Sequence, residues 1–128
     1  MTSYCIPREY LAKFWPHTAP LIRRAIERVG ISRFEDIERD LFNDYALLWI
    51  HWDGKEIDCA AVTQIGGDVC TVVAVGGKNI KAWIDSEKML GEYAKANGCK
   101  RLRGIGRDGW RRFLPAYKRK YFVIERDL

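Results

Sequence analysis

The chain has 128 residues and a mass of 14.9 kDa, so it is long enough for one ordinary domain and too short for two independent cores. Hydrophobic residues make up 48 %, charged residues 30 %, and the formal net charge is +5, a composition that excludes a disordered or collagen-like chain. No apolar run approaches the roughly 20 residues that span a bilayer, and the first residues lack the basic start and apolar centre of a signal peptide, so we expect one intracellular domain over residues 1–128 without a membrane partner.

Two amphipathic helices are predicted in the first third of the chain. Thr18 is placed to cap a helix whose apolar residues recur at helical spacing as far as Val29, and Gly30 follows where a helix-ending glycine belongs. Ser32-Arg33-Phe34-Glu35 has the capping-box form and predicts the start of a second helix. A segment bracketed by two prolines, residues 9–15, is a weaker helical candidate.

The middle of the chain changes to the period of strands. Residues 45–52 and 57–65 are rich in aromatic and aliphatic side chains, and Asp53-Gly54 between them is a strong hairpin signal. Gly66-Gly67-Asp68 predicts a second turn, and the nearly all-apolar residues 69–75 predict a strand covered on both faces. The sequence therefore predicts an antiparallel meander of three strands.

From Asn79 the pattern is helical again, and it stops at Asn97-Gly98. Residues 100–107 are predicted as a strand, 108–117 as a short helix and 121–125 as a final strand. A strand, a long helix and a following strand in one sheet form a right-handed parallel crossover. The predicted fold class is α/β, with a mixed central sheet in which an antiparallel meander is followed by β-α-β-α-β, and with helices on both faces.

The cysteines indicate packing rather than metal binding. The four cysteines show no C-x-x-C spacing, and His17 and His51 are the two histidines, so no zinc-ligand pattern is recognisable and we expect no metal site. Cys59 and Cys70 lie in apolar runs, which predicts reduced thiols in the core. The alternative, a catalytic cysteine, lacks a local signature.

Positive charge is concentrated near the C-terminal end. Residues 100–120 hold nine basic residues and a single acid, Asp108, while the rest of the chain holds 13 basic and 16 acidic residues. Such asymmetry predicts a surface that attracts anions, either the phosphates of a cofactor or those of a nucleic acid. A solvated basic face is an equally good interpretation.

The order of the predicted elements resembles that of the GNAT superfamily of N-acetyltransferases, and particular residues carry the resemblance. The central strand ends in Gly76-Gly77 and leads into the long helix, as the acyl-CoA pyrophosphate loop does in that superfamily. The helix end at residues 92–99 is similar to the family's Tyr-Ala-x-x-x-Gly-Cys ending, and Gly106-Arg107-Asp108-Gly109-Trp110 resembles a segment of small acetyltransferase-like proteins of tailed phages. The resemblance covers residues 18–128 and is strongest over 45–128, which implies a single GNAT-like domain.

This resemblance implies acetyl-CoA as the cosubstrate, with no metal. The family's loop has the form Gln/Arg-x-x-Gly-x-Gly/Ala, and residues 73–80 fit it in neither register, because Lys78 or Asn79 stands where a small residue lets the backbone approach phosphate. The loop is thus degenerate, with lysines as compensating point charges. The cofactor-binding residues implied are Val75, Gly76, Gly77, Lys78 and Lys81. The alternative is that the two glycines only turn the strand into the helix.

Tyr117 is the catalytic residue that the resemblance implies. In many members of the superfamily a tyrosine in the last helix lies four residues before a Gly-Phe pair, and Tyr117 has this spacing to Tyr121-Phe122. Its phenol would return a proton to the leaving thiolate; the alternative is a tyrosine that packs the last helix against the sheet. A general base is harder to assign, and the candidates are His51, Glu56, Asp58 and Asp68.

Three classes of function follow from these observations. The first is an acetyltransferase-like protein that catalyses acyl-CoA-dependent N-acyl transfer to an amine. The second is a non-catalytic GNAT-fold phage accessory or virion protein with a protein partner, in the host cytoplasm or the virion. The third is a module that binds a polyanion such as nucleic acid weakly, through the basic stretch and its interleaved aromatic residues. The first three of those aromatics recur at helical spacing, which favours a place in the core instead, and the set is Trp110, Phe113, Tyr117 and Tyr121.

Overall fold

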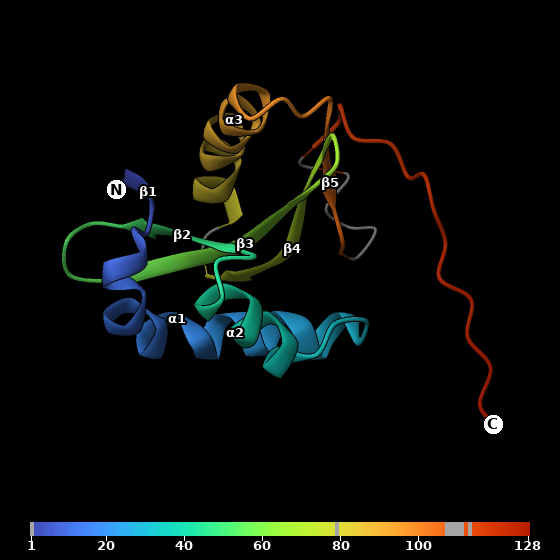
Figure 1. Cartoon of the computed structure of the whole chain (residues 1–128), viewed down its shortest axis with the longest axis horizontal. Coiled ribbons are helices and arrows are strands. Elements are labelled where there is room, and N and C mark those ends of the chain that lie inside the picture. Colours follow the sequence, from blue (N-terminus) through green and yellow to red (C-terminus); the bar gives the residue numbers. More distant parts are fainter. Residues whose placement is uncertain (1, 79, 107–111, 113) are drawn as a thin grey trace.

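The computed structural model describes residues 2–78, 80–106, 112 and 114–128. The regular elements of this part of the chain are, in order, β1 (Thr2–Cys5), α1 (Arg8–Val29), α2 (Phe34–Phe42), β2 (Leu47–Trp52), β3 (Ile57–Gly66), β4 (Val69–Gly77), α3 (Ile80–Ala96) and β5 (Arg101–Gly104). The strands form one sheet in the order β1-β2-β3-β4-β5, with antiparallel pairs from β1 to β4 and a parallel pair of β4 with β5 (Figure 1). The predicted mixed sheet is confirmed.

Helices cover both faces of this sheet, with α1 and α2 on one side and α3 on the other (Figure 1). Successive strand residues point to opposite faces, so neighbouring side chains belong to different cores. The core under α1 and α2 includes Leu48, Ile50, Ala60, Val62 and Ala74 of the strands. The core under α3 includes Trp49, Cys59, Ala61 and Val72, which pack with Trp83 and Leu90 of the helix.

Helix α1 is longer than the sequence predicted, because it continues through both Pro16 and Pro20. Thr18 is therefore not a cap: it is buried inside the helix, and its hydroxyl donates to the carbonyl oxygens of Phe14 and Trp15, each at 3.2 Å. The free energy gained by burying this face against the sheet exceeds the cost of the backbone hydrogen bonds that the prolines cannot donate.

None of the helices in the described part of the chain, α1 included, combines the length and apolarity that crossing a bilayer requires.

The predicted helix ends are partly right. Gly30 ends α1 in the left-handed conformation at φ 73°, and its amide donates to the carbonyl oxygen of Ile26 at 2.8 Å. The capping box is wrong, since Arg33 occupies the N-cap of α2 and no side chain caps that helix. The Asp53-Gly54 turn is confirmed: the carboxylate of Asp53 accepts hydrogen bonds from the next amides of the turn.

The chain beyond β5 differs most from the prediction. The predicted strand at residues 121–125 is wrong, because this segment pairs with no strand of the described residues and lies exposed to solvent (red in Figure 1). Half of the predicted helix at residues 108–117 falls outside the described residues, and residues 114–117 are not helical. The sheet of the described residues therefore ends at β5.

Candidate functional site

The last two strands of the sheet part from one another halfway along β4. Residues 69–72 of β4 pair with β5, and the amide of Ile105 then donates to the carbonyl oxygen of Val72 at 3.2 Å. Val73 has no partner in the ladder with β3, and such a bulge bends the strand. Beyond it, β4 continues to Gly77 with no described strand on its outer edge. One strand edge is thus left open beside β5.

The hydrogen bonds of β4 show which of its amides face this opening. The amide of Lys78 donates to the carbonyl oxygen of Asp58 in β3 at 2.8 Å. Backbone groups of successive residues point to alternate edges of an antiparallel ladder. The amides of Val75 and Gly77 therefore point away from β3, toward the open side.

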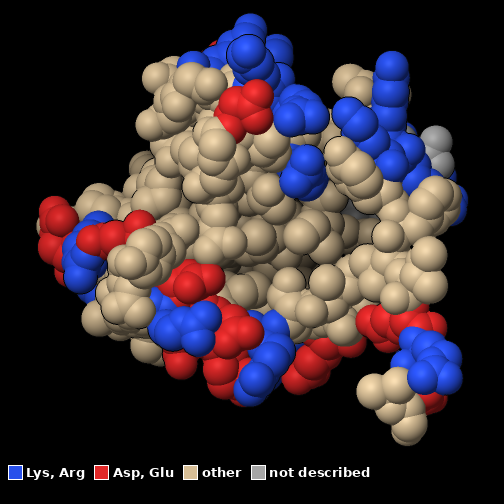
Figure 2. Space-filling view, turned by 45° about the vertical axis from the view of Figure 1, so that its right-hand side comes forward, with Lys and Arg blue, Asp and Glu red and all other residues tan. Residues whose placement is uncertain are grey.

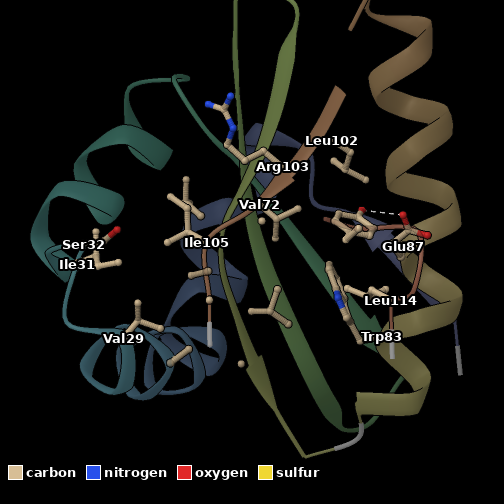
Figure 3. A pocket seen from close by; sticks show the side chains of 18 of the residues that line it. Val29, Ile31, Ser32, Val72, Trp83, Glu87, Leu102, Arg103, Ile105 and Leu114 are labelled. Atoms are coloured by element: carbon tan, nitrogen blue, oxygen red, sulfur yellow. Dashed lines mark hydrogen bonds between the residues drawn. The ribbon is translucent and has the colours of Figure 1, made fainter. Parts of the chain in front are cut away.

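A cavity of about 1060 Å³ occupies this opening. It reaches both faces of the sheet, and Figure 3 shows its two sides. The side toward α3 carries Trp83, Glu87, Leu102 and Leu114 (Figure 3). The side toward α1 and α2 carries Val29, Ile31, Ser32 and Ile105 (Figure 3). The C-terminal segment, residues 116–123, supplies a further wall.

Basic side chains dominate the charged lining of the cavity. Among its described lining residues the acid is Glu87, and the basic residues are Arg24, Arg28, Arg101, Arg103, Lys118, Arg119 and Lys120. Figure 2 shows basic side chains gathered over the upper part of this face, with most acidic ones along the lower edge. The field around the opening therefore favours anions.

Tyr117 lies in the wall of this cavity and is held by Glu87. Its hydroxyl donates to Oε1 of Glu87 at 2.8 Å (dashed line in Figure 3). Burial and the hydrogen bond to this carboxylate raise the pKa of Tyr117 well above its usual range. The phenol is therefore protonated at neutral pH, as a proton donor must be.

Sequence reasoning missed Glu87, although α3 carries a signal for it. Trp83, Glu87, Leu90 and Gly91 fall on one face of the helix, at spacings of three and four residues, and all line the cavity. A single acid within an apolar stripe of a helix is a candidate for a functional residue.

Gly76 and Gly77 line the cavity and are also required by packing. A Cβ on Gly76 would lie 2.1 Å from the carbonyl oxygen of Leu21 in α1. A Cβ on Gly77, whose φ is 148°, would lie 2.1 Å from the carbonyl oxygen of Asp58. Close approach of α1 to β4 and of β3 to β4 thus demands both glycines.

Of the other predicted cofactor-binding residues, some line the cavity and some do not. Val75 lines the cavity, whereas Lys78 is exposed and is not among the lining residues. Lys81 belongs to α3, and its side chain lies outside the described part of the chain. Residues 78 and 79 form the whole connection from β4 to α3.

The candidates for a general base do not gather around Tyr117. His51 Nδ1 and Asp58 Oδ1 lie 2.8 Å apart, because a bulge places two residues of β3 opposite His51. Both side chains are largely buried. Neither of them lines the cavity. Asp68 lies 3.5 Å from Arg101 in an exposed ion pair, and Glu56 is exposed in the turn before β3.

The cysteines are free thiols, and Cys59, Cys70 and Cys99 are buried as a core position requires. Burial, followed by the nearby charge of Asp58, raises the pKa of Cys59 to about 12, so this thiol is not ionised at neutral pH. Among the described side chains, no group of three or more His, Cys, Asp or Glu is placed to hold a metal ion.

No family model and no curated protein matches the sequence. Solved structures match nearly the whole chain. A probable acetyltransferase superposes with a TM-score of 0.72 at 10 % identity, over 99 % of this chain and 100 % of that one. A GNAT family acetyltransferase from Staphylococcus aureus gives a TM-score of 0.63 at 12 % identity, over 99 % and 98 % of the two chains.

The chain has the GNAT fold. Another GNAT-like neighbour is a predicted acetyltransferase from Clostridium acetobutylicum, solved with acetyl-CoA, with a TM-score of 0.67 at 11 % identity over 99 % of this chain and 94 % of that one. At such identities the likeness shows the fold and leaves the chemistry to the site.

Proposed function

We propose that this GNAT-fold protein binds acyl-CoA in the cavity beside β4 and transfers the acyl group to an amine. The observation that carries the proposal is the open edge of β4, which lies in a basic cavity that also contains Tyr117. An extended chain with amide groups, such as the pantetheine arm of CoA, can add to a free strand edge through backbone hydrogen bonds. The amides of Val75 and Gly77 are placed for this.

The proposed reaction is attack of the amine nitrogen on the thioester carbonyl carbon. A C–N bond forms, the C–S bond breaks, and the thiolate takes the proton of the Tyr117 hydroxyl. The proton that the amine loses passes to solvent or to a base, and the Tyr117 phenolate takes a proton from solvent before the next turnover. Glu87 is a positioning residue in this scheme, because it holds the phenol in the cavity wall.

Side chains, rather than a glycine loop, are proposed to hold the pyrophosphate. The amide of Lys78 is already bonded to Asp58, and the short connection after β4 offers little further backbone. Basic side chains of the cavity, Arg103 and Arg119 among them, supply the positive charge instead. Contacts of this kind at the surface are screened by salt.

Acetyl-CoA is therefore expected to bind with a dissociation constant weaker than about 10 μM, which corresponds to roughly 7 kcal/mol. Isothermal titration calorimetry with acetyl-CoA, at low and at physiological ionic strength, should show affinity falling as salt is raised. Arg103→Gln is expected to weaken binding about tenfold, the worth of one charged hydrogen bond. Lys95→Gln, a change on an exposed lysine outside the cavity, serves as the control.

Binding tighter than this and insensitive to salt would contradict the side-chain model, and would place the phosphates on the backbone near Gly76 and Gly77. No heat of binding at millimolar acetyl-CoA would contradict the enzyme proposal itself.

The short connection between β4 and α3 favours a second candidate function. It leaves little backbone for a phosphate loop, which fits a GNAT-fold protein that has no catalytic role and acts through protein contacts. The phage accessory or virion role suggested by the sequence resemblance belongs to this candidate. This second candidate function predicts no heat of binding when the protein is titrated with acetyl-CoA, whereas the acyl-transfer proposal predicts weak binding.

Weak binding of polyanions is proposed for the basic stretch at residues 100–120. In support, Lys118, Arg119 and Lys120 are exposed side by side. The aromatic residues give less support for stacking on bases. The hydroxyl of Tyr117 is bonded to Glu87, and Trp110 and Phe113 lie outside the described residues. Attraction without stacking or base readout gives binding that has no sequence preference.

Labelled oligonucleotides are expected to bind at about 50 mM salt and to be released at about 200 mM, a range over which several phosphate contacts change affinity by orders of magnitude. Fluorescence anisotropy measures this. Replacing the three residues Lys118, Arg119 and Lys120 with serine should flatten the dependence of log K on log salt. Sub-micromolar binding that persists at the higher salt, or a clear sequence preference, would contradict this expectation.

A further inference from the structure

Two arginines of α1 bring uncompensated positive charge to the side of the cavity toward α1 and α2. Arg24 and Arg28 both line the cavity and lie four residues apart, on the same face of the helix. No acidic side chain of the described residues forms an ion pair with either of them, whereas Arg101, also in the lining, lies 3.5 Å from Asp68. Two like charges at this spacing destabilise a helix, so an anion bound beside them would be stabilising.

The core holds these arginines next to the open edge of β4. A Cβ on Gly76 would lie 2.1 Å from the carbonyl oxygen of Leu21 and 3.4 Å from the Cβ of Ala25, so this face of α1 rests directly on the strand. Leu21 and Ala25 line the cavity together with Arg24 and Arg28. The two guanidinium groups are therefore carried by a packed helix rather than by a loop.

Apolar surface accompanies the charge on this side of the cavity. Three apolar side chains lie together there, those of Val29, Ile31 and Ile105 (Figure 3). Among the described lining residues the acid is Glu87, which belongs to α3 on the opposite side (Figure 3). The α1 side thus offers cations and apolar surface to a ligand, and no described carboxylate for a cationic one.

The chemistry of acyl transfer places the attacking amine on the α1 side. A nucleophile approaches the carbonyl carbon of a thioester from one face of the planar group, where the orbitals are aligned. When the acyl-CoA arm lies along the edge of β4, one face of the thioester is turned toward α3 and the other toward α1. The hydroxyl of Tyr117 is bonded to Glu87 of α3, so the proton donor lies on the α3 side and leaves the other face to the amine.

We propose that the α1 side of the cavity selects, as the acyl acceptor, a small amine that also carries an anionic group, a carboxylate or a phosphate. Arg24 and Arg28 hold the anionic group through charged hydrogen bonds, which guanidinium groups form with both kinds of anion. The apolar residues cover the body of the molecule, and the basic lining repels polyamines and other purely cationic amines. This inference rests on the proposed acyl transfer for the position of the amine, and it adds the class of acceptor.

Direct binding tests the acceptor class without requiring catalysis. Two matched pairs of amines compare a charged group with a neutral one: leucine with leucinamide for the carboxylate, and O-phosphoethanolamine with ethanolamine for the phosphate. Ligand-observed NMR titrations of the full chain, with and without millimolar CoA, are expected to show an anionic amine binding at least about tenfold more tightly than its neutral partner, the worth of one charged hydrogen bond.

The variant Arg24→Gln/Arg28→Gln is expected to abolish this preference while leaving the affinity for the neutral amines unchanged. Arg23→Gln is the matched control, because it removes the same charge from the same helix at a residue that does not line the cavity, and it should keep the preference. The double variant should also leave the affinity for acetyl-CoA unchanged, whereas Arg103→Gln weakens it. This difference separates an acceptor site from a site for the pyrophosphate.

The proposal is overturned if neither anionic amine binds more tightly than its neutral partner, if spermidine binds more tightly than both, or if the double variant keeps the preference. Failure of acyl transfer itself gives a different result: the anionic amine binds with the expected preference, and mass spectrometry detects no acylated product after incubation with acetyl-CoA. Acylation of neutral or cationic amines ahead of anionic ones would support acyl transfer and overturn the acceptor class.

Discussion

Replacing Gly76 with alanine is expected to lower the free energy of unfolding by about 3 kcal/mol, the upper part of the range for overpacked positions. The new Cβ would lie 2.1 Å from the carbonyl oxygen of Leu21 and 2.8 Å from its carbonyl carbon. Both atoms belong to the backbone of α1, so no side-chain rotation relieves the clash. Helix α1 must shift away from β4, which loosens the packing of Ile22 and Ile26 in the core.

Gly66→Ala provides the matched control for this variant. Gly66 ends β3 in the same sheet, a Cβ there meets no atom within 4 Å, and its φ lies outside the left-handed region. Its substitution should change stability by less than about 0.5 kcal/mol, as for other surface positions. Urea denaturation of both variants measures the difference. If Gly76→Ala were as stable as the natural chain, packing would not explain this glycine, and close approach of a ligand would.

The β-meander and α3 could be predicted because local signals agree there with the final packing. Asp53-Gly54 supplies its own turn hydrogen bonds, and β4 is apolar on both faces because helices cover both. Helix α1 could not be predicted in full, since Pro16 and Pro20 weaken it locally while burial of its inner face holds it together. Tertiary packing overrides local preference at such a helix.

Strand pairing at the two ends of the sheet could not be predicted from the sequence either. Thr2–Cys5 is too short and too mixed in pattern to predict a strand, yet β1 forms because β2 offers it an edge. Residues 121–125 have a strand-like pattern and form none, because they lie along no edge of their own domain. A strand requires a partner, and the pattern of one segment does not specify where that partner is.

The sequence pointed to one of the two hydrogen-bonded residues of the candidate site, Tyr117, and not to the other, Glu87. The resemblance named Tyr117, and the structure places this residue in the cavity wall, where its catalytic role remains a prediction. Its partner Glu87 was missed because the two residues are 30 positions apart and meet only when the C-terminal segment lies across α3. The close approach of α1 that explains Gly76 is likewise a tertiary contact, and a strand-to-helix sequence carries no sign of it.

Tyr117→Phe is expected to lower kcat about 100-fold in an acyl-transfer assay, the low end for the loss of a general acid. The phenylalanine ring keeps its place in the cavity wall, and only the hydroxyl that donates to Glu87 is removed. Burial and Glu87 raise the pKa of Tyr117, so the phenol holds its proton throughout the neutral range, although the raised pKa also makes it a weaker acid toward the thiolate that forms close by. The melting temperature is expected to change little.

Two further variants separate proton donation from packing. Tyr45→Phe removes the hydroxyl of an exposed tyrosine that does not line the cavity, and should leave kcat unchanged. Glu87→Gln keeps a hydrogen-bond acceptor for Tyr117 while removing the negative charge, so the pKa of the phenol falls toward its usual value. The phenol is then still protonated at neutral pH and is a stronger acid, so kcat should change less than tenfold, below the range for losing the acid itself. A Tyr117→Phe protein that turns over near the natural rate would contradict the general-acid role, and would leave Tyr117 as a residue that packs the C-terminal segment against α3.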